Sequence, residues 1–412
     1  MKRFVSMLLG VASSLLLTAF PVLGGNQITI IAGGGTQLPQ VGLQATAVSI
    51  DSYVSKVDVS GNIYIAEDDY NENLPGRGFV RVNNFGVVDE VLLDPGFIEY
   101  IDDLAVDSSG NVYLPFHNQF CVYKVTPTKE ISVYAGVCGA SGYSGDNGPA
   151  TSALLETIES VAVDLEGNLY INNYHGTPGV IRKVDRQGII TTLLNDPTLG
   201  SVTDSLYSDG IGNLYFYARD QGKVYKTDLA GGNVAFAGSG TNGHSGDGLS
   251  ALAANIGDVI GIAGDKWGNV FIAYGFEGTN YIRKIDANGI ITTVASWPYD
   301  GSSIARISAD GDGSIFLTIH NNRIDKLTFD PEVSSLTPAD GSGGQVVKLA
   351  GRYFLNRGAG GTVTFGGVQA QVLSWSNEMI VCKVPQGLTR TVPVIVTTKD
   401  GQVSPAVSFR VR

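Results

Sequence analysis

The stretch Ser160–Leu194, SVAVDLEGNLYINNYHGTPGVIRKVDRQGIITTLL, decides the fold of this chain. Its first half alternates apolar and polar residues on both sides of Asp164-Leu165-Glu166-Gly167, a polar turn that ends in a glycine able to adopt a positive φ. Its second half repeats this arrangement around a turn from Asp185 to Gly188, and its β-branched residues suit a pleated sheet. The stretch therefore predicts four short antiparallel strands.

The same unit recurs six times along the chain. The copies share an aspartate, a turn that ends in Gly-Asn or Gly-Ser, and then an apolar, an aromatic and a second apolar residue. The turn aspartates are Asp58, Asp107, Asp164, Asp209, Asp265 and Asp310. Their spacing of 45 to 57 residues is typical of β-propeller blades and is too long for leucine-rich repeats. Because Asp and Asn hydrogen-bond nearby backbone in turns, we interpret these residues as structural.

The two ends of the repeat region favour a closed ring over a solenoid. The last copy ends after a third strand, Arg323 to Leu327, and a matching fourth-strand pattern, Gln27 to Gly33, precedes the first copy. An N-terminal strand that completes the last blade would leave no unpaired edge at the seam. We therefore expect an all-β chain in which residues 26–328 form a six-bladed β-propeller closed by an N-terminal strand.

The repeat also resembles a known family. The patterns AVD, GNLYI, IRKVD and GIITT, joined by Ala-Gly and SGDxG segments, are similar to the NHL-repeat β-propellers of exported bacterial proteins. The resemblance covers Gln27 to Thr328 and is clearest in the third and fifth copies. It implies a six-bladed ring that serves as a binding platform.

The first 25 residues have the pattern of a secretory signal peptide. Lys2 and Arg3 precede an apolar run from Val5 to Phe20, and small residues follow at Gly24 and Gly25. A retained membrane anchor is the alternative, because the run approaches the length that a span needs. We expect a secreted, periplasmic or cell-surface protein with no membrane span once the signal has been removed.

The chain changes character after the last copy. Residues 329–332 are expected to be a linker, and residues 333–412 contain short alternating or apolar segments that are typical of a β-sandwich. The Leu-Thr-Pro motif at 336–338, Gly351-Arg-Tyr-Phe354 and Val363-Thr-Phe-Gly-Gly367 resemble an IPT/TIG immunoglobulin-like domain. The resemblance implies a spacer or an interaction module.

The net charge excludes one class of partner. The chain carries a formal charge of −12. Loss of the signal peptide would remove the positive charges of Lys2 and Arg3 and make the chain still more negative. A negative protein repels polyanions, so nucleic acid is not an expected partner. We expect a monomer without a cofactor whose partner is an extracellular or envelope protein or a glycan.

The connections that vary between copies point to one binding face. Strands that run alternately up and down place the second-to-third-strand loops and the long loops between copies on the same face, and variable loops commonly carry binding residues. The candidate ligand-binding residues on this face are Asp68, Tyr70, His117, Tyr143, Asp146, His175, Arg219, His244, Asp247, Tyr274 and His320.

Metal chemistry is the main alternative for these residues. His117, His175 and His320 each lie seven or eight residues after a turn glycine, and three histidines with an open position would suit a catalytic zinc. The copies concerned are the second, third and sixth, which are not symmetrically placed. Asp146 and Asp247 lie in glycine-rich Ser-Gly-Asp contexts without the alternating carboxylates of an EF-hand, so a glycine-rich turn is the simpler interpretation. We therefore predict no metal site.

The cysteines predict one covalent contact. Cys121 begins the third strand of the second copy and Cys138 lies just beyond its fourth. A turn centred between Lys129 and Glu130 would place the two cysteines opposite each other, which predicts a disulfide in an oxidising compartment. Cys382 alternates with Ile380 and Val384, so it is expected to be a buried core residue.

Two function classes follow from these patterns. The first is a non-enzymatic binding or scaffold protein that uses the loop face of the propeller. The second is a metal-dependent hydrolase or lyase on the same face. No GxSxG, Walker or HExxH motif favours the enzyme.

Overall fold

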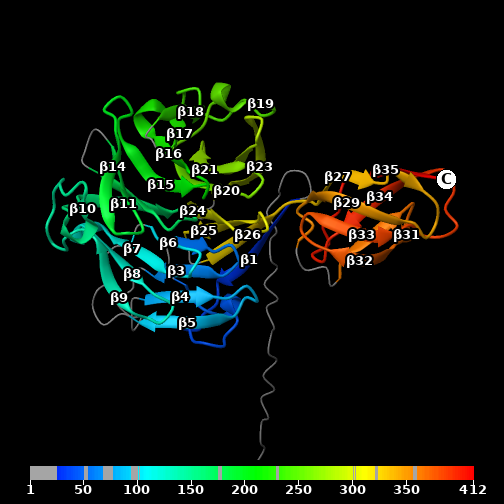
Figure 1. Cartoon of the computed structure of the whole chain (residues 1–412), viewed down its shortest axis with the longest axis horizontal. Coiled ribbons are helices and arrows are strands. Elements are labelled where there is room, and N and C mark those ends of the chain that lie inside the picture. The colour runs from blue at the N-terminus through cyan, green and yellow to red at the C-terminus, as the bar shows by residue number, and fades with distance from the viewer. Residues whose placement is uncertain are drawn as a thin grey trace, which may run out of the picture.

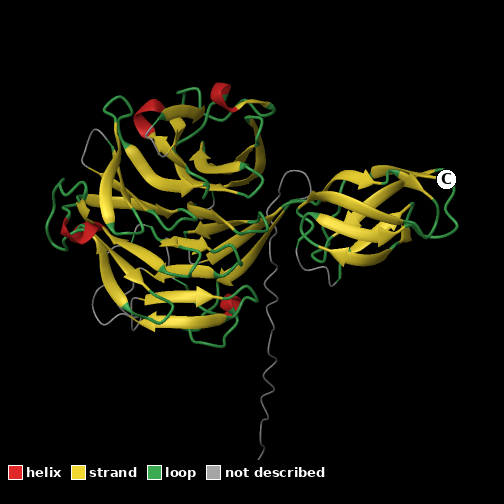
Figure 2. Ribbon diagram, viewed as in Figure 1, coloured by secondary structure: helices red, strands yellow, loops and turns green. Residues whose placement is uncertain are grey.

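The computed structural model describes residues 26–50, 54–67, 78–93, 101, 103–174, 179–228, 232–299, 301, 303–320, 323–355 and 360–412. In this part of the chain the regular structure consists of strands, with short 3-10 helices in the connections (Figure 1, Figure 2). The chain is therefore all-β, as expected. Residues 1–25, the expected signal peptide, lie outside the described residues.

Residues 27–328 form six antiparallel sheets, numbered I to VI in chain order. Sheet I contains β2 (Val54–Val57), β3 (Ile63–Glu67), β4 (Gly78–Val82) and β5 (Val88–Leu93). Sheet II contains β6 (Ala105–Val106), β7 (Val112–Phe116), β8 (Cys121–Val125) and β9 (Ile131–Ala135). Sheet III contains β11 (Thr157–Val163), β12 (Leu169–Tyr174), β13 (Val180–Val184), β14 (Ile189–Asn195) and, outside β14, the short β10 (Gly148–Pro149).

The second half of this region repeats the pattern. Sheet IV contains β15 (Val202–Ser208), β16 (Asn213–Ala218), β17 (Lys223–Asp228) and β18 (Asn233–Ala237). Sheet V contains β20 (Val259–Gly264), β21 (Val270–Phe276), β22 (Thr279–Ile285), β23 (Ile290–Pro298) and, outside β23, the short β19 (Leu249–Ser250). Sheet VI contains β24 (Ile304–Ala309), β25 (Ile315–Ile319), β26 (Arg323–Thr328) and β1 (Gln27–Gly33).

Sheet VI combines the two ends of this region. Its outer strand β1 pairs antiparallel with β26, from Gln27 opposite Thr328 to Gly33 opposite Arg323. The N-terminal strand therefore occupies the fourth-strand position that the last sequence copy leaves empty.

The first strands of the six sheets lie around a common axis. In the order β2, β6, β11, β15, β20 and β24 each contacts the next, and β24 contacts β2. All six strands line one cavity of about 150 Å³. The arrangement is propeller-like, and Figure 1 shows the six sheets gathered in one body beside the C-terminal sheets.

The recurring aspartate organises each turn between the first two strands. Asp58 Oδ1 accepts the backbone N–H groups of Ser60 at 2.8 Å and Asn62 at 2.9 Å, and its Oδ2 accepts the Asn62 side chain at 2.7 Å. Gly61 adopts φ +82°, which favours glycine. In four further turns, an asparagine four residues after the aspartate donates its backbone N–H and its side-chain amide to the aspartate carboxylate in the same way. These aspartates are Asp107, Asp164, Asp209 and Asp265. The turns are thus structural in this part of the chain.

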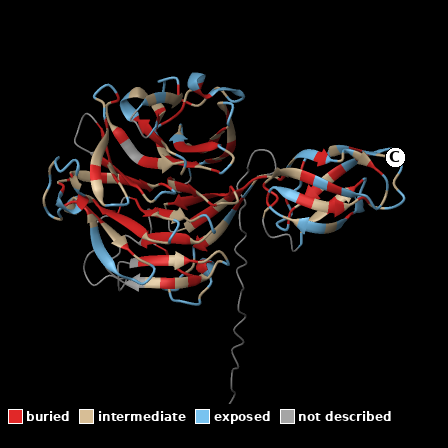
Figure 3. Ribbon diagram, in the orientation of Figure 1, coloured by how far each residue is buried: buried red, intermediate tan, exposed pale blue. Residues whose placement is uncertain are grey.

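Neighbouring sheets pack through buried apolar residues. Figure 3 shows how the buried residues are distributed along the strands. Between sheets II and III, for example, Val122 packs in one cluster with Val161 and Ile171, all at most 1% exposed. Each such side chain contributes about 1.5–3 kcal/mol relative to an exposed position. The core is therefore distributed among the sheet interfaces.

The C-terminal residues form a two-sheet sandwich. One sheet contains β27 (Glu332–Thr337), β29 (Val346–Arg352), β33 (Met379–Lys383) and β32 (Gln371–Trp375). The other contains β28 (Asp340–Gly341), β35 (Val407–Val411), β34 (Thr391–Thr397), β30 (Thr362–Phe365) and β31 (Val368–Gln369). Their shared core includes Leu349, Phe365, Phe409 and Cys382. Cys382 is a buried free thiol, and burial raises its pKa to about 11.

Candidate functional site

The six sheets have two distinct ends, which we call the turn face and the loop face. The turn face carries the aspartate turns at 58–62, 107–111, 164–168, 209–213, 265–269 and 310–314. The loop face carries the described second-to-third-strand connections at 117–120, 219–222 and 277–278, and it is where the three long segments 34–50, 136–156 and 238–258, which precede sheets I, III and V, begin and end. Antiparallel strand order places these two sets of connections at opposite ends.

The described candidate residues do not form one cluster. His117 and Arg219 begin two equivalent 3-10 helices, η2 (His117–Gln119) and η4 (Arg219–Gln221), which connect β7 to β8 and β16 to β17. The His320 N–H donates to Ser303 O at 2.9 Å, and burial together with Arg306 lowers the pKa of His320. Asp68, Tyr70 and His175 lie outside the described residues.

The long segment before sheet III is fastened to the sheet by a buried arginine. Arg182 in β13 has a wholly buried side chain, and its Nη2 lies 2.7 Å from Asp146 Oδ1 and 3.1 Å from Ser144 O. The Tyr143 ring lies 5.0 Å from the guanidinium, and its hydroxyl is 2.7 Å from Thr192 Oγ1. Two of the predicted ligand residues, Tyr143 and Asp146, therefore contact the scaffold.

The segment before sheet V repeats this arrangement. Asp247 Oδ1 pairs with Nη2 of the buried Arg283 in β22, and Arg283 Nη1 donates to Asn255 O at 3.2 Å. His244 takes the place of Tyr143: it stacks on Tyr281 at 3.8 Å between ring centroids, and its Nδ1 is 2.9 Å from the hydroxyl of buried Tyr274.

The electrostatics of this second cluster favour a paired carboxylate and a neutral imidazole. Burial alone would raise the pKa of Asp247, but hydrogen bonds from Thr293 and Arg283 and the Arg283 charge lower it overall. Burial, and then the charge of Arg283, lowers the pKa of His244. These groups thus hold a loop in place.

All three long segments also cover the outer strand of the sheet that follows. Before sheet III, Asn147 N donates to Ile190 O and Ala150 N donates to Gly188 O, both at 2.8 Å. The same spacing recurs before sheets I and V. The equivalent pairs are Gly42 N to Val88 O, Ala45 N to Gly86 O, Gly248 N to Ile291 O and Ala251 N to Gly289 O. Each pair is followed by a 3-10 helix: η1 (Ala45–Ala47), η3 (Ala150–Ser152) and η5 (Ala251–Ala253).

Sequence reasoning missed the two arginines that hold these loops. The available signal was that Ile-Arg-Lys occurs only in the third and fifth copies, which are also the copies preceded by a Ser-Gly-Asp segment. The co-occurrence indicates a contact between loop and strand.

The loop that contains Cys138 has a covalent link as well. Cys121 and Cys138 form a disulfide, with Cα atoms 5.1 Å apart. The bond connects the start of β8 to the segment that leaves β9.

Among the described residues, no three His, Cys, Asp or Glu side chains are grouped so that they could hold a metal ion. Within the same residues, no helix is long and apolar enough to cross a membrane.

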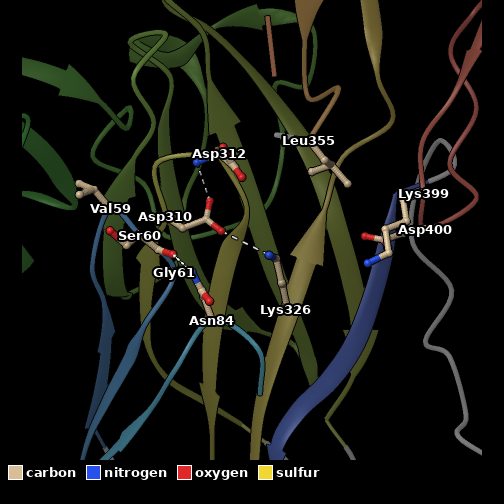
Figure 4. A pocket seen from close by; sticks show the side chains of 10 residues that line it. All are labelled: Val59, Ser60, Gly61, Asn84, Asp310, Asp312, Lys326, Leu355, Lys399 and Asp400. Carbon is tan, nitrogen blue, oxygen red and sulfur yellow. Dashed lines mark hydrogen bonds and ion pairs between the residues drawn. The ribbon is translucent and has the colours of Figure 1, made fainter. Parts of the chain in front are cut away.

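A second cavity of about 150 Å³ lies at the junction of the two domains (Figure 4). Asp310 and Lys326 from sheet VI line one side, and Lys399 and Asp400 from the C-terminal domain line another. Lys326 Nζ lies 3.3 Å from Asp310 Oδ2, so the central charges neutralise each other. The C-terminal domain therefore meets the turn face.

Comparison with known proteins identifies the C-terminal domain. The IPT/TIG domain family matches residues 331–411. Teneurin-3 of Danio rerio is 32% identical over 154 residues, which are 34% of this chain and 5% of that protein. The chain thus spans about a twentieth of the length of this curated relative.

Two solved structures are similar mainly in their fold. An auxiliary nutrient binding protein from Bacteroides thetaiotaomicron has a TM-score of 0.52 and 11% identity, and the match covers 73% of this chain and 75% of that one. A streptogramin B lyase has a TM-score of 0.49 and 12% identity, with 73% and 97% covered. The arrangement of the six sheets makes the body of the chain propeller-like, and the family match shows an IPT/TIG domain at its C-terminal end.

Proposed function

We propose that this chain is an exported, non-enzymatic binding protein in which an NHL-type propeller engages a protein or glycan through its loop face. The observation that carries this proposal is that three long loops are each fastened to the scaffold and each present exposed apolar side chains. They are Leu38 and Val41 before sheet I, Val137 and Tyr143 before sheet III, and Leu249 and Leu252 before sheet V, all 38–66% exposed.

Fastened loops make a favourable binding surface. Ordering a mobile loop on binding costs free energy, and a loop already held by Arg182–Asp146 or Arg283–Asp247 avoids most of that cost. Apolar and aromatic side chains surrounded by polar residues are the usual anchors of recognition surfaces. The three loops enter alternate sheets. Leu38, Val137 and Tyr143 lie toward the loop face, whereas Val41, Leu249 and Leu252 lie where their loops cover the outer strands.

The proposed scaffold is a six-bladed propeller closed by β1. It is supported by the cyclic contacts of the six first strands, by the cavity that all six line, and by the pairing of β1 with β26. In this interpretation residues 26–328 are the propeller, residues 329–332 the linker and residues 333–412 the IPT/TIG domain.

An exported location is supported by the N-terminal pattern and by the Cys121–Cys138 disulfide, because disulfides persist mainly in oxidising compartments. The partner would then be an extracellular or envelope protein or glycan. We propose a monomer, with the IPT/TIG domain at the turn face leaving the loop face accessible.

Matched surface variants test the proposal. Leu38→Ser with Val137→Ser changes the loop face, and Leu165→Ser with Ile211→Ser makes the same chemical change at exposed positions of the turn face. Each full-length protein is applied to a glycan array and to native envelope and culture material. We expect the loop-face variant to lose at least about tenfold in captured partner and the turn-face variant to bind normally. Equal loss in both variants, or no loss in either, would refute a loop-face site.

Metal analysis of the purified protein tests the enzymatic alternative. Stoichiometric zinc or calcium that disappears when His117, His175 and His320 are replaced together would overturn the non-enzymatic proposal. A metal-free protein with the binding pattern above would support it.

A further inference from the structure

The hydroxyl group of a tyrosine completes the aspartate turn in three of the sheets. In sheets I, II and III, the residue six positions after the turn aspartate is Tyr64, Tyr113 or Tyr170. Its hydroxyl donates to the same Oδ2 that accepts the Asn side chain, at 3.3, 3.1 and 2.9 Å respectively. Oδ2 is therefore satisfied by two donors, one from the turn and one from the second strand.

Sheet V lacks this hydroxyl group. The residue six positions after Asp265 is Phe271, which is fully buried and stacks on Phe329 at 5.4 Å between ring centroids. Asp265 still accepts the Asn269 side chain at 2.7 Å. Because Asp265 is itself buried, a carboxylate oxygen with one donor fewer would cost stability.

The C-terminal domain supplies the missing donor. The Tyr353 hydroxyl donates to Asp265 Oδ2 at 3.1 Å, which repeats the contact made by the intrinsic tyrosines of sheets I to III. It also accepts a hydrogen bond from Asn269 Nδ2 at 3.3 Å. Tyr353 is only 4% exposed although it follows β29 of the other domain. It has φ +57°, a conformation that a residue with a side chain rarely adopts without compensating contacts.

The surroundings of Tyr353 fit its ring closely. Trp267 of the sheet V turn packs edge-on against it at 4.6 Å, and Phe329 of the linker lies 5.1 Å away. A Cβ atom at Gly313 of the sheet VI turn would collide with the Trp267 ring and approach Tyr353, so the small residue leaves room for this cluster.

Two polar contacts extend the junction. Asn377 is buried, and its Nδ2 donates to Asp312 O at 3.0 Å in the sheet VI turn. Lys266 Nζ lies 2.8 Å from Glu378 Oε1, but both side chains are exposed, and such pairs contribute little. The specific part of the junction is therefore the buried set around Tyr353.

We infer that the IPT/TIG domain is a structural part of sheet V: Tyr353 replaces the tyrosine that the fifth repeat lacks, and the turn face of sheets V and VI is its permanent docking surface. The two domains then behave as one unit, with the loop face held at a fixed position relative to the C-terminal domain. This inference does not depend on the proposed function, because it concerns only the turn face.

Three full-length variants test it. Tyr353→Ala removes the ring and the hydroxyl, and Tyr353→Phe removes only the hydroxyl. Tyr113→Phe is the matched control, because it removes the same hydroxyl from a turn within the six sheets. Calorimetry measures whether the chain unfolds in one transition, small-angle scattering measures its radius of gyration, and circular dichroism confirms that each variant is folded.

The native chain should unfold in one transition. Tyr353→Phe and Tyr113→Phe should each lower Tm by about 2–6 °C, the effect of losing one hydrogen bond to a charged group in a chain of this size. Only Tyr353→Ala should split the transition in two and increase the radius of gyration. If Tyr353→Ala keeps one transition and the native radius of gyration, the inference is wrong. It is also wrong if Tyr113→Phe separates the two domains to the same extent.

A second-site change checks the chemistry of the replacement even if Tyr353→Ala does not fold. Phe271→Tyr places a hydroxyl six residues after Asp265, where sheets I to III have theirs. In this background Tyr353→Phe should lower Tm by less than half as much as it does alone. An equal effect in both backgrounds would show that the two hydroxyl positions are not equivalent.

Discussion

Asp146 and Arg182, 36 residues apart in sequence, form an ion pair of 2.7 Å in which the arginine side chain is wholly buried and the aspartate side chain is 39% exposed. The pair joins the long segment before sheet III to β13, the third strand of that sheet. Asp247 and Arg283 form the same pair in sheet V. The carboxylates of the two Ser-Gly-Asp segments therefore hold these long loops against their sheets.

Removal of one partner of this pair should destabilise the protein. Asp146→Ala leaves the buried Arg182 guanidinium with one acceptor fewer, and we expect a loss of about 1–3 kcal/mol, less than for a fully buried pair because Asp146 is partly hydrated. The double variant Asp146→Ala/Arg182→Met should lose less than the sum of the single variants. Urea unfolding measures all three values, and strict additivity would contradict a direct interaction.

The His244 cluster should make stability depend on pH. Burial beside Arg283 lowers the pKa of His244 below its usual value near 6.5, so the folded protein favours the neutral ring. The unfolded chain then binds more protons, and this contribution to stability is present above about pH 6.5 and is lost as the pH falls below it. Tyr274, Tyr281, Thr293, Arg283 and Asp247 are the groups that face the ring.

The third sheet offers a matched substitution for this test. His244→Tyr introduces the residue that sheet III has at the equivalent position, where the Tyr143 hydroxyl contacts Thr192. The variant should stay folded, and the difference in Tm between variant and native protein should grow in favour of the variant from pH 7 to pH 5. A difference that does not change with pH would show that His244 is not responsible.

The disulfide should stabilise sheet II. Cys121→Ser/Cys138→Ser removes a cross-link over 17 residues, which costs about 2–4 kcal/mol in the chain-entropy description. Intact mass after alkylation in denaturant should show one modified thiol, that of Cys382, without reductant and three with it. Three modified thiols without reductant would mean that the bond does not form.

The sequence was informative about features that repeat and uninformative about features that occur once. The Asp-x-x-Gly turns and the strands around them occur six times, so the turn geometry seen at Asp58 could be predicted from local pattern. The arginine–aspartate pair occurs in only two copies, as Arg182–Asp146 and Arg283–Asp247, and its partners lie 36 residues apart. Tyr353 and Asp265 are 88 residues apart in different domains, and no local pattern joins them. The candidate residues were chosen by loop position, which does not reveal that Asp146 and Asp247 are already paired.

Asp325 provides a pH effect of opposite sign to that of His244. It occupies in β26 the position that Arg182 and Arg283 hold in β13 and β22, and its Oδ2 accepts Arg323 Nε at 3.2 Å. Burial raises its pKa to about 6, although Arg323 acts in the other direction. Between about pH 4 and pH 6 the folded protein therefore binds a proton that the unfolded chain has lost, so this site stabilises the protein as the pH falls through 6.

Asp325→Asn should remove this contribution while keeping the shape of the side chain. As the pH rises from 4 to 7, the free energy of unfolding of the variant should increase by about 1–3 kcal/mol relative to that of the native protein. The reason is that Asp325 of the native protein becomes a buried negative charge over this range, whereas the asparagine stays neutral. Taking the difference between the two proteins at each pH cancels the contribution of His244, which both retain. Urea unfolding at half-unit intervals gives this difference. A difference that is constant over the range would mean that Asp325 ionises normally and that Arg323 compensates fully for its burial.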